Sequence, residues 1–392
     1  MKSINQRSLE LHEKNKGKLA ISSKVPLENL DDLSLAYSPG VAAPCVEIHK
    51  NNEDVYKYTS KGNMVAVITD GSAVLGLGNI GPLAALPVME GKCLLFKKFA
   101  NVDAVPICLN TQDPKEIISI VKNIAPTYGG INLEDISFPR CVEIEETLRD
   151  ELDIPLFHDD QHGTAIVVCA ALINACKLVG KEIEKLQIVI SGLGAAGSAI
   201  AKLLRQMGAT KIYATNSRGA VSKLKNNNEL INKLLNEHII DTFDMENANL
   251  KEIIKDADCF IGVSVKDILT IDMVNSMSEK PIVFALANPD PEISYENVKK
   301  SNAFIYATGR SDIYNQINNV LAFPGIFHGA FKAKSKKITD EMYETTARAI
   351  ANLIKDKEIT REYIIPSPFD ERVMEAVSDA VYKKAKEQGI CR

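Results

Sequence analysis

The apolar positions in the first 160 residues fall into short runs that are separated by polar turns. Four of these runs predict buried strands, at residues 64–69 (MVAVIT), 93–96 (CLLF), 104–108 (AVPIC) and 154–157 (IPLF). Residues 113–124 are typical of a helix, with Pro114 at its first position. The polar turn at 158–163 (HDDQHG) precedes an apolar helix at 164–179, and Gly180 is well suited to end that helix.

The pattern changes near residue 186, where strands and amphipathic helices begin to alternate. LQIVIS (186–191) predicts a strand, SAIAKLLRQMG (198–208) a helix and KIYATN (211–216) a second strand. Further strands are expected at 259–262 and 282–286. This alternation is typical of a Rossmann-like, doubly wound parallel sheet.

The two patterns predict two α/β domains. Residues 1–160 are expected to form an N-terminal α/β domain, and residues 161–392 a Rossmann-like sheet with C-terminal helices over 338–391. A chain of 392 residues, 45% of them hydrophobic, can bury more than one core, because single cores stop growing near about 250–300 residues.

Composition narrows the classes of protein that fit. The formal net charge of -5 argues against a general nucleic-acid binder, which needs a basic face. Asn174 and Lys177 interrupt the apolar helix at 164–179, which is short for a bilayer, so we expect no membrane span. The N-terminus lacks the apolar run of a secretory signal. The eight cysteines include no C-x-x-C pair and are expected to be reduced thiols in the cytoplasm.

The motif G-x-G-x-x-G occurs twice, at 76–81 (GLGNIG) and at 192–197 (GLGAAG). The motif binds a dinucleotide only between a strand and an amphipathic helix. After the first copy, Pro82, Pro87 and Gly91 interrupt the segment that should be helical, so this copy is not expected to bind a cofactor.

The second copy lies between a predicted strand and a predicted amphipathic helix. Its backbone amides can approach a pyrophosphate at the positive end of the helix. The alternative is a tight turn between strand and helix that binds nothing. The residues expected to bind the cofactor here are Gly192, Gly194, Ala195, Ala196 and Gly197.

The end of the following strand bears on the choice between NAD and NADP. An acidic residue there binds the ribose 2′-hydroxyl of NAD, whereas an arginine suits the 2′-phosphate of NADP. The sequence has Asn216-Ser217-Arg218, without an acid, which favours NADP over NAD. In the alternative reading, Arg218 only faces solvent.

Two pairs of acids suggest a site for a hard divalent cation. Glu134 and Asp135 are adjacent, and Asp159 and Asp160 lie in the polar turn before the apolar helix. Clustered carboxylates repel one another unless a cation compensates, and oxygen ligands suit Mg²⁺ or Mn²⁺. As alternatives, the first pair could be a solvated surface pair, and an acid of the second pair could cap the helix.

Two histidines flank the second acidic pair, four residues apart, at His158 and His162. A zinc site of the H-E-x-x-H type requires both histidines on one helix face. Because this segment is predicted to be a turn, zinc is not expected, and the histidines are expected to hydrogen-bond near the site.

Tyr37 lies in a Tyr-Ser-Pro-Gly loop, and Lys92 follows Glu90-Gly91 before an apolar run. A lysine near a metal and a cationic nicotinamide would have a lowered pKa and could act as a base. Taken alone, the two residues are better explained as a packed ring at Tyr37 and a surface charge at the end of a strand at Lys92.

Several segments together resemble the malic enzymes, in their compact bacterial and archaeal form. The matching stretches span most of the chain in the family's order. They are LAYSPGVAAPC (35–45), AVITDGSAVLGLGNIGPLAALPVMEGKCLLFK (66–97), GGINLEDI (129–136), PLFHDDQHGTAIV (155–167), SGLGAAG (191–197), FALANPDPEI (284–293) and ATGRSDIYNQINNVLAFPGIF (307–327).

The resemblance implies roles for individual residues. The family's general acid corresponds to Tyr37 and its general base to Lys92, which also contacts substrate. The metal ligands correspond to Glu134, Asp135 and Asp160.

Three asparagines are similar to family residues near substrate and nicotinamide. Asn288 corresponds to a residue that contacts both, and Asn318 and Asn319 are assigned to substrate and cofactor respectively. The longer members of the family hold a malate carboxylate with an arginine where this chain has Ala73, so the cation for that carboxylate stays open.

The resemblance implies oxidative decarboxylation of L-malate to pyruvate with NADP or NAD and Mg²⁺ or Mn²⁺, by a homodimer. Lys92 would take the C2 hydroxyl proton as hydride leaves, and Tyr37 would protonate C3 of the enolate. Three alternatives stay open: a malolactic enzyme, a 2-hydroxyacid dehydrogenase that does not decarboxylate, and a dinucleotide sensor without activity. The presence of Tyr37, Lys92 and the three acids speaks against a sensor, which needs none of them.

Overall fold

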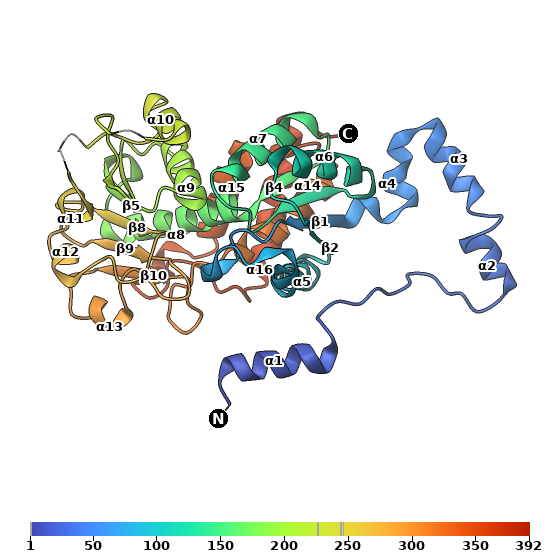
Figure 1. The fold of residues 1–392 in the computed structure, drawn as a ribbon, viewed down its shortest axis with the longest axis horizontal. Helices are drawn as coiled ribbons and strands as arrows, with labels where there is room; N and C mark the ends of the chain where they lie inside the picture. The colour runs from blue at the N-terminus through green and yellow to red at the C-terminus, as the bar shows by residue number, and fades with distance from the viewer. Residues whose placement is uncertain (1, 226, 244, 246) are drawn as a thin grey trace.

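The computed structural model describes residues 2–225, 227–243, 245 and 247–392. Its described residues contain two largely parallel sheets surrounded by helices, as the predicted α/β class requires. The first sheet has the strand order β2-β1-β3-β4 and the second the order β10-β9-β8-β5-β6-β7. Both lie in the body of the molecule in Figure 1.

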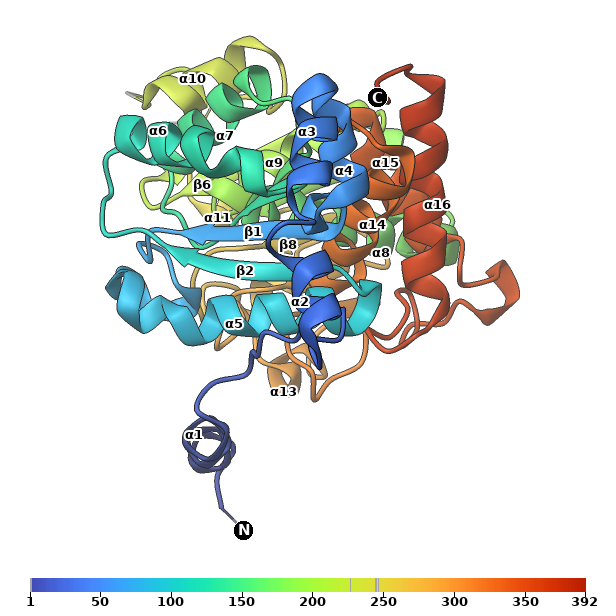
Figure 2. The same ribbon diagram turned by 90° about the vertical axis from the view of Figure 1, so that its right-hand side faces the viewer.

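All strand pairs of the first sheet are parallel. Its strands are β1 (Met64–Thr69), β2 (Asp103–Cys108), β3 (Gly130–Leu133) and β4 (Leu156–His158). Helix α5 (Gly81–Ala100) covers one face, while α6 (Pro114–Ile124) and α7 (Arg140–Glu151) lie on the other (Figure 2). The side chain of Asp113 caps α6 by accepting the backbone N–H groups of Lys115 and Glu116.

The second sheet is parallel except for its short edge strand β7, which is antiparallel to β6. Its strands are β5 (Gln187–Ser191), β6 (Lys211–Asn216), β7 (Gly219–Ala220), β8 (Cys259–Gly262), β9 (Ile282–Ala285) and β10 (Ile305–Thr308). Helix α9 (Ala195–Gln206) follows β5 directly, as the glycine fingerprint predicts. The remaining helices of this region are α10 (Glu229–Asn236), α11 (Leu250–Ile253), α12 (Ile271–Asn275) and α13 (Tyr295–Val298).

The expectation of a strand at residues 93–96 is wrong, as is the expectation that Pro87 and Gly91 interrupt a helix. Both segments belong to α5, which buries Met89, Cys93 and Phe96 at helical spacing. An apolar run of four residues fits a buried helix face as well as a strand, so the run alone could not decide.

Helix α8 (Thr164–Val179) passes through the centre of the molecule, and Gly180 ends it in the left-handed conformation. The segment Asp159–Val179 is long and apolar enough to cross a membrane, but 72% of its most apolar window is buried inside the protein. Its side chains join the largest hydrophobic core, which includes residues of both sheets. We therefore interpret α8 as a core helix.

The C-terminal helices contact both halves of the molecule. They are α14 (Phe323–Ala333), α15 (Asp340–Ala351) and α16 (Arg372–Glu387). Helix α15 packs on α8, whereas α14 packs on α5 of the first sheet. The ring of Phe96 lies edge-on to Phe323 and Phe327, with centroids 4.7 and 5.4 Å away, so aromatic packing joins the two halves.

The N-terminal segment projects from the body as an arm (Figure 1). It contains α1 (Ile4–Asn15), α2 (Leu30–Ala36) and α3 (Ala42–Lys50), and it joins the body through α4 (Val55–Tyr58). None of these helices has a buried residue. Exposed apolar side chains recur along the arm, for example Leu27, Leu30 and Leu35. The arm therefore exposes several large apolar side chains to solvent in a single copy of the chain.

Candidate functional site

A pocket of about 550 Å³ lies at the carboxyl ends of strands from both sheets. It brings together most of the residues that the sequence singles out, although they come from both halves of the chain. The predicted residues in its lining are Lys92, Glu134, Asp135, Asp160, Ala195, Ala196, Asn288, Asn318 and Asn319, together with Ala73. The carboxyl ends of parallel strands are where α/β proteins bind ligands.

Three carboxylates in this pocket converge on one point. Ligand oxygens of Glu134, Asp135 and Asp160 all lie within 4.8 Å of one another. Glu134 and Asp135 follow β3 at its carboxyl end, and Asp160 follows β4, the neighbouring strand. The parallel pairing of β3 and β4 therefore places the two acidic pairs of the sequence side by side.

The pKa values of these carboxylates indicate that the protein compensates their negative charges only in part. Burial raises the pKa of Glu134 well above its usual value, and the neighbouring acids raise it further, against the opposing charge of Lys92. Burial and Asp160 raise the pKa of Asp135 to about 8. One oxygen of Asp135 is buried without a hydrogen-bond partner. A hard divalent cation would compensate the charges and bind that free oxygen, so this set fits Mg²⁺ or Mn²⁺.

Lys92 projects from α5 into the same pocket. Its Nζ lies 2.6 Å from Asp159 Oδ2 and 2.9 Å from Glu134 Oε1, and 4.3 Å from the ring centroid of Phe323. Burial lowers the pKa of Lys92, but the charges of Asp159 and Glu134 outweigh it and raise the pKa above its usual value. The lowered pKa expected from the sequence is therefore absent in this arrangement, in which Lys92 is the counterion of two acids.

Asp159 has a role that the sequence reasoning missed. The structure places it beside Lys92, and its Oδ2 also accepts a hydrogen bond of 3.0 Å from Asn319 Nδ2. Asn319 Nδ2 also lies 3.2 Å from Thr164 Oγ1, the first residue of α8. Adjacency to Asp160 could have pointed to Asp159, but only the fold shows which oxygen faces which neighbour.

The turn that carries both aspartates has π-helical hydrogen bonds over Asp159–Gly163 and is held from beneath by Glu145 of α7. The carboxylate of Glu145, which is 3% exposed, accepts Gln161 Nε2 at 2.8 Å and lies 2.6 Å from His162 Nε2. His158 is fully buried, 3.9 Å from Asp160. Within the described residues, neither histidine belongs to a cluster with metal-ligand geometry.

The second glycine fingerprint forms the turn between β5 and α9. Gly192 has φ +101°, and a side chain at Gly197 would overlap the Gly192 carbonyl oxygen, so both positions need glycine. The carbonyl of Thr215 accepts the N–H groups of Gly192 and Leu193, both at 3.0 Å. This leaves the first turn of α9, with Ala195 and Ala196 at the pocket, to present its amides to a ligand.

The first fingerprint has a different position. It forms the loop into α5, where a Cβ at Gly76 would lie 2.6 Å from the carbonyl oxygen of Asn288. This loop of the first half therefore touches the loop that carries Asn288 in the second half, and it precedes a helix of the first sheet.

Asn216 and Arg218 lie at the end of β6, outside the lining of the pocket. The side chain of Asn216 accepts the N–H of Arg218 at 2.8 Å and so shapes the turn. The Arg218 side chain is exposed. Lys225 Nζ donates to the carbonyls of Arg218 and Ala220, which brings a second cation to this turn.

Tyr37, like Asn216 and Arg218, is a candidate residue that does not line the pocket. It follows α2 on the N-terminal arm and is 68% exposed. The described residues that line the pocket include no tyrosine. In a single copy of the chain, the proposed acid and base are therefore on separate parts of the molecule.

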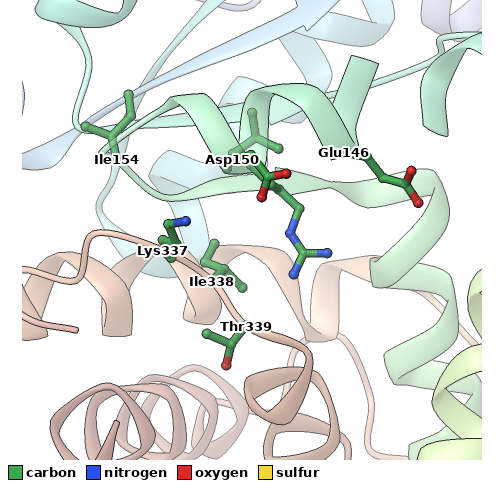
Figure 3. A pocket seen from close by; sticks show the side chains of 8 residues that line it. Glu146, Asp150, Ile154, Lys337, Ile338 and Thr339 are labelled. Carbon is green, nitrogen blue, oxygen red and sulfur yellow. The ribbon is translucent and has the colours of Figure 1, made fainter. Parts of the chain in front are cut away.

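A second pocket, of about 280 Å³, lies between α7 and the segment before α15 (Figure 3). Arg149 and Lys337 balance Glu146 and Asp150 in its lining, and Arg149 pairs with Asp340 at 2.8 Å. None of the predicted site residues lines it, so it is separate from the carboxylate pocket.

Family models match nearly the whole chain. The malic enzyme N-terminal domain matches residues 16–149, and the malic enzyme NAD-binding domain matches residues 161–386. The chain is 54% identical to the bifunctional malic/malolactic enzyme of Bacillus subtilis, over 100% of this chain and 95% of that protein. It is 50% identical to the NAD-dependent malic enzyme of Geobacillus stearothermophilus, over 96% of this chain and 78% of that protein.

Solved structures show the same similarity. The malic enzyme of Pyrococcus horikoshii has a TM-score of 0.92 and 46% identity, covering 100% of this chain and 92% of its own. The NAD-dependent malic enzyme of Thermotoga maritima has a TM-score of 0.91 and 46% identity, covering 96% and 98%. The NADP-dependent malic enzyme of Escherichia coli is 44% identical, but this chain spans 53% of its length.

The raised pKa of Asp135 predicts that metal binding depends on pH. With a pKa of about 8, this carboxyl carries a proton at pH 7, and a metal ligand must lose it. Mn²⁺ affinity should therefore rise with pH up to about 8 and then level off, with proton release below that pH. Calorimetry in two buffers of different ionisation enthalpy measures the release. Asp135→Asn should abolish it, and equal affinity at pH 6 and pH 8 would refute the assignment.

The fingerprint geometry predicts a binding defect without a folding defect. A Cβ at Gly194 meets nothing within 4 Å, and its φ of -104° suits any residue. Gly194→Val should fold normally but obstruct the pyrophosphate, raising the cofactor KM at least tenfold. Gly78→Val, at φ +74°, serves as the control and should lower the melting temperature more than it raises the cofactor KM. The reverse pattern would show that the wrong loop was chosen.

Proposed function

The chain belongs to the malic enzyme family, and from this premise we propose that it converts L-malate to pyruvate and CO₂ while reducing NAD(P)⁺. The observation that carries the proposal is the meeting of three convergent carboxylates, a buried lysine and a dinucleotide fingerprint in one pocket. Oxidation of an alcohol needs a base and a hydride acceptor, and decarboxylation of the resulting β-keto acid needs an electron sink at C2.

Glu134, Asp135 and Asp160 are proposed to hold Mg²⁺ or Mn²⁺. When bound, the ion supplies Lewis-acid polarisation of the oxygen at C2, in oxidation and in decarboxylation. The buried rings of Phe323 and Phe96 lie next to Lys92 and exclude water from that side of the pocket.

Lys92 is proposed to receive the hydroxyl proton. Asp159 lies 2.6 Å from Lys92 Nζ and orients the lysine, whose amine in its neutral form accepts the proton from C2–OH. Asn319 fixes the orientation of the Asp159 carboxylate through its hydrogen bond. Asn288 and Asn318 line the pocket and can donate hydrogen bonds to a malate carboxylate, at a site where Ala73 offers no charge.

The cofactor-binding residues are proposed to be the 192–197 turn, Asn216 and Arg218. Relatives that use NAD and relatives that use NADP are both similar to this chain, so identity alone does not choose between them. The cation at the end of β6 supports NADP, and Lys225 adds a second positive charge there.

The position of Tyr37 supports a homodimer in which each site is completed by the other copy. Tyr37 is exposed on an arm that has many exposed apolar side chains and whose helix α2 buries none of its residues. Lys92 belongs to helix α5. The outer face of this helix is also apolar and exposed, at Leu83 and Leu94. We propose that the arm of one copy covers this face of the other and brings Tyr37 to C3 of the enolate. We further propose a domain boundary at residues 160/161 and a cytoplasmic location.

Malolactic activity is a second candidate function, because the Bacillus subtilis relative carries that name. If the reduced cofactor stays bound, hydride can return to C2 of pyruvate and give lactate without net cofactor reduction. The same residues serve both outcomes, so product release decides between them.

A direct assay tests the proposal. Malate with NAD⁺ and with NADP⁺, in parallel and with Mn²⁺ or EDTA, should give pyruvate, CO₂ and reduced cofactor only when metal is present. Lactate without accumulation of reduced cofactor would indicate the malolactic course instead. Full activity after exhaustive chelation would exclude the metal role, and oxaloacetate as the sole product would indicate a plain dehydrogenase.

Mixing two inactive variants tests the exchange of Tyr37. Tyr37→Phe and Lys92→Ala should each lose at least about 10²-fold in rate. In a mixed dimer, one site combines an intact arm with an intact pocket, so re-equilibrated mixtures should regain about a quarter of the wild-type sites. If Tyr37 acts within its own chain, no mixed dimer has an intact site, and the mixture stays inactive.

A further inference from the structure

Glu292 is a buried carboxylate that the proposed chemistry does not use. It is fully buried, at the end of the loop that connects β9 to the segment before α13. Glu292 does not line the pocket, although Ser264 and Ala287, which bond it, do. A buried carboxylate without a cation is costly unless several donors satisfy it.

Backbone and side-chain donors from two loops surround this carboxylate. Its Oε1 accepts the N–H of Ser264 at 2.8 Å and the Oγ of Ser264 at 3.3 Å. Its Oε2 accepts the N–H of Ala287 at 3.1 Å. A Cβ at Gly262 would lie 2.6 Å from Oε1, so the glycine there makes room for the carboxylate. Glu292 thus ties the end of β8 to the end of β9.

The hydrogen bonds continue across the sheet toward the cofactor. Ser264 Oγ lies 3.0 Å from Ser191 Oγ, and Thr215 Oγ1 donates to Ser191 Oγ at 3.3 Å. Ser191 directly precedes Gly192 of the fingerprint. The strands β9, β8, β5 and β6 are neighbours in this order, so one line of bonds crosses their carboxyl ends.

The loop from Ala287 to Glu292 also contacts the first half of the molecule. Ala287 is followed by Asn288, which lines the pocket. The Asn288 carbonyl and the Pro289 ring lie so close to Gly76 that an added Cβ would meet them at 2.6 and 2.7 Å. The loop is therefore fixed between the Glu292 carboxylate and the 76–81 loop, and Asn288 has little freedom to move on its own.

We propose that Glu292 is a positioning residue that couples cofactor binding at the 192–197 turn to the placement of Asn288 against the substrate. The proposal rests on the proposed function, which puts malate and nicotinamide in this pocket. Coupling of this kind is reciprocal: malate tightens cofactor binding by the factor by which cofactor tightens malate binding. The connected hydrogen bonds give such coupling a physical route, and a measured coupling constant is what demonstrates it.

The test measures that constant in the full-length enzyme. Fluorescence titration of the reduced cofactor, with Mn²⁺ present and with or without malate, gives the ratio of the two dissociation constants. Glu292→Gln leaves one oxygen and places an NH₂ group toward the second loop, so one loop loses its acceptor. The ratio should fall at least about fivefold, while cofactor affinity without malate changes less than about threefold.

A second variant keeps the test decisive if Glu292→Gln folds poorly. Ser191→Ala removes the middle of the line of bonds, at a position that is 1% exposed and outside the pocket lining, and it should also lower the ratio. Asn174→Ala is the matched control. The side chain of Asn174 is fully buried, away from the pocket, and its Nδ2 donates hydrogen bonds to the backbone carbonyls of Ala351 and Ile364. Its loss should therefore lower the melting temperature and leave the ratio of dissociation constants unchanged.

These experiments distinguish failure of the proposed function from failure of the role proposed for Glu292. Metal-dependent decarboxylation of oxaloacetate without cofactor should survive in Glu292→Gln, because it does not need the coupling. Wild-type enzyme without this activity and without malate oxidation would refute the proposed function itself. Active wild type, with an unchanged ratio in both Glu292→Gln and Ser191→Ala, would overturn the role of Glu292. An equal fall of the ratio in Asn174→Ala would also overturn it, by showing a general loss of structure.

Discussion

Four carboxylates share one buried pocket with a single lysine as their ion-paired partner. Glu134, Asp135, Asp159 and Asp160 lie close together at the ends of β3 and β4, and Lys92 bonds only two of them. Burial and like charges raise the pKa of Glu134, Asp135 and Asp160 and cost stability, so the rest of the protein must hold these groups in place. The arrangement fits a site that binds a cation, because a divalent ion would compensate the buried charges.

The fold supplies that support from several directions. Parallel pairing of β3 with β4 sets the spacing of the acids, and Glu145 fixes the π-helical turn from below. Helix α5 places Lys92 opposite them, with its position fixed by the packing of Phe96 on Phe323 and Phe327. Since α14 carries both of these rings and belongs to the C-terminal helices, the end of the chain stabilises a site formed near its beginning.

The cofactor side of the pocket and the N-terminal arm differ in how the rest of the chain supports them. A line of hydrogen bonds from Glu292 through Ser264 and Ser191 to Thr215 joins the carboxyl ends of adjacent strands. The N-terminal arm is different, because its helices α2 and α3 bury no residue. In a single copy of the chain, Tyr37 therefore lies on the exposed arm, while the carboxylates, Lys92 and the 192–197 turn belong to the body.

By itself, the sequence determined what depends on neighbours along the chain. The alternation of strand and helix, the start of α6 at Pro114, the end of α8 at Gly180 and the β5–turn–α9 unit follow from local patterns, and the structure confirms them. Family motifs also pointed to residues that the pocket brings together. Residues 93–96 were wrongly predicted as a strand, because four apolar residues fit either element. Only the tertiary structure decided the pairing of Asp159 with Lys92, the packing of the C-terminal helices on both halves and the separation of Tyr37 from the pocket. These are contacts between residues far apart in the chain, and no local pattern specifies which distant surface a side chain meets.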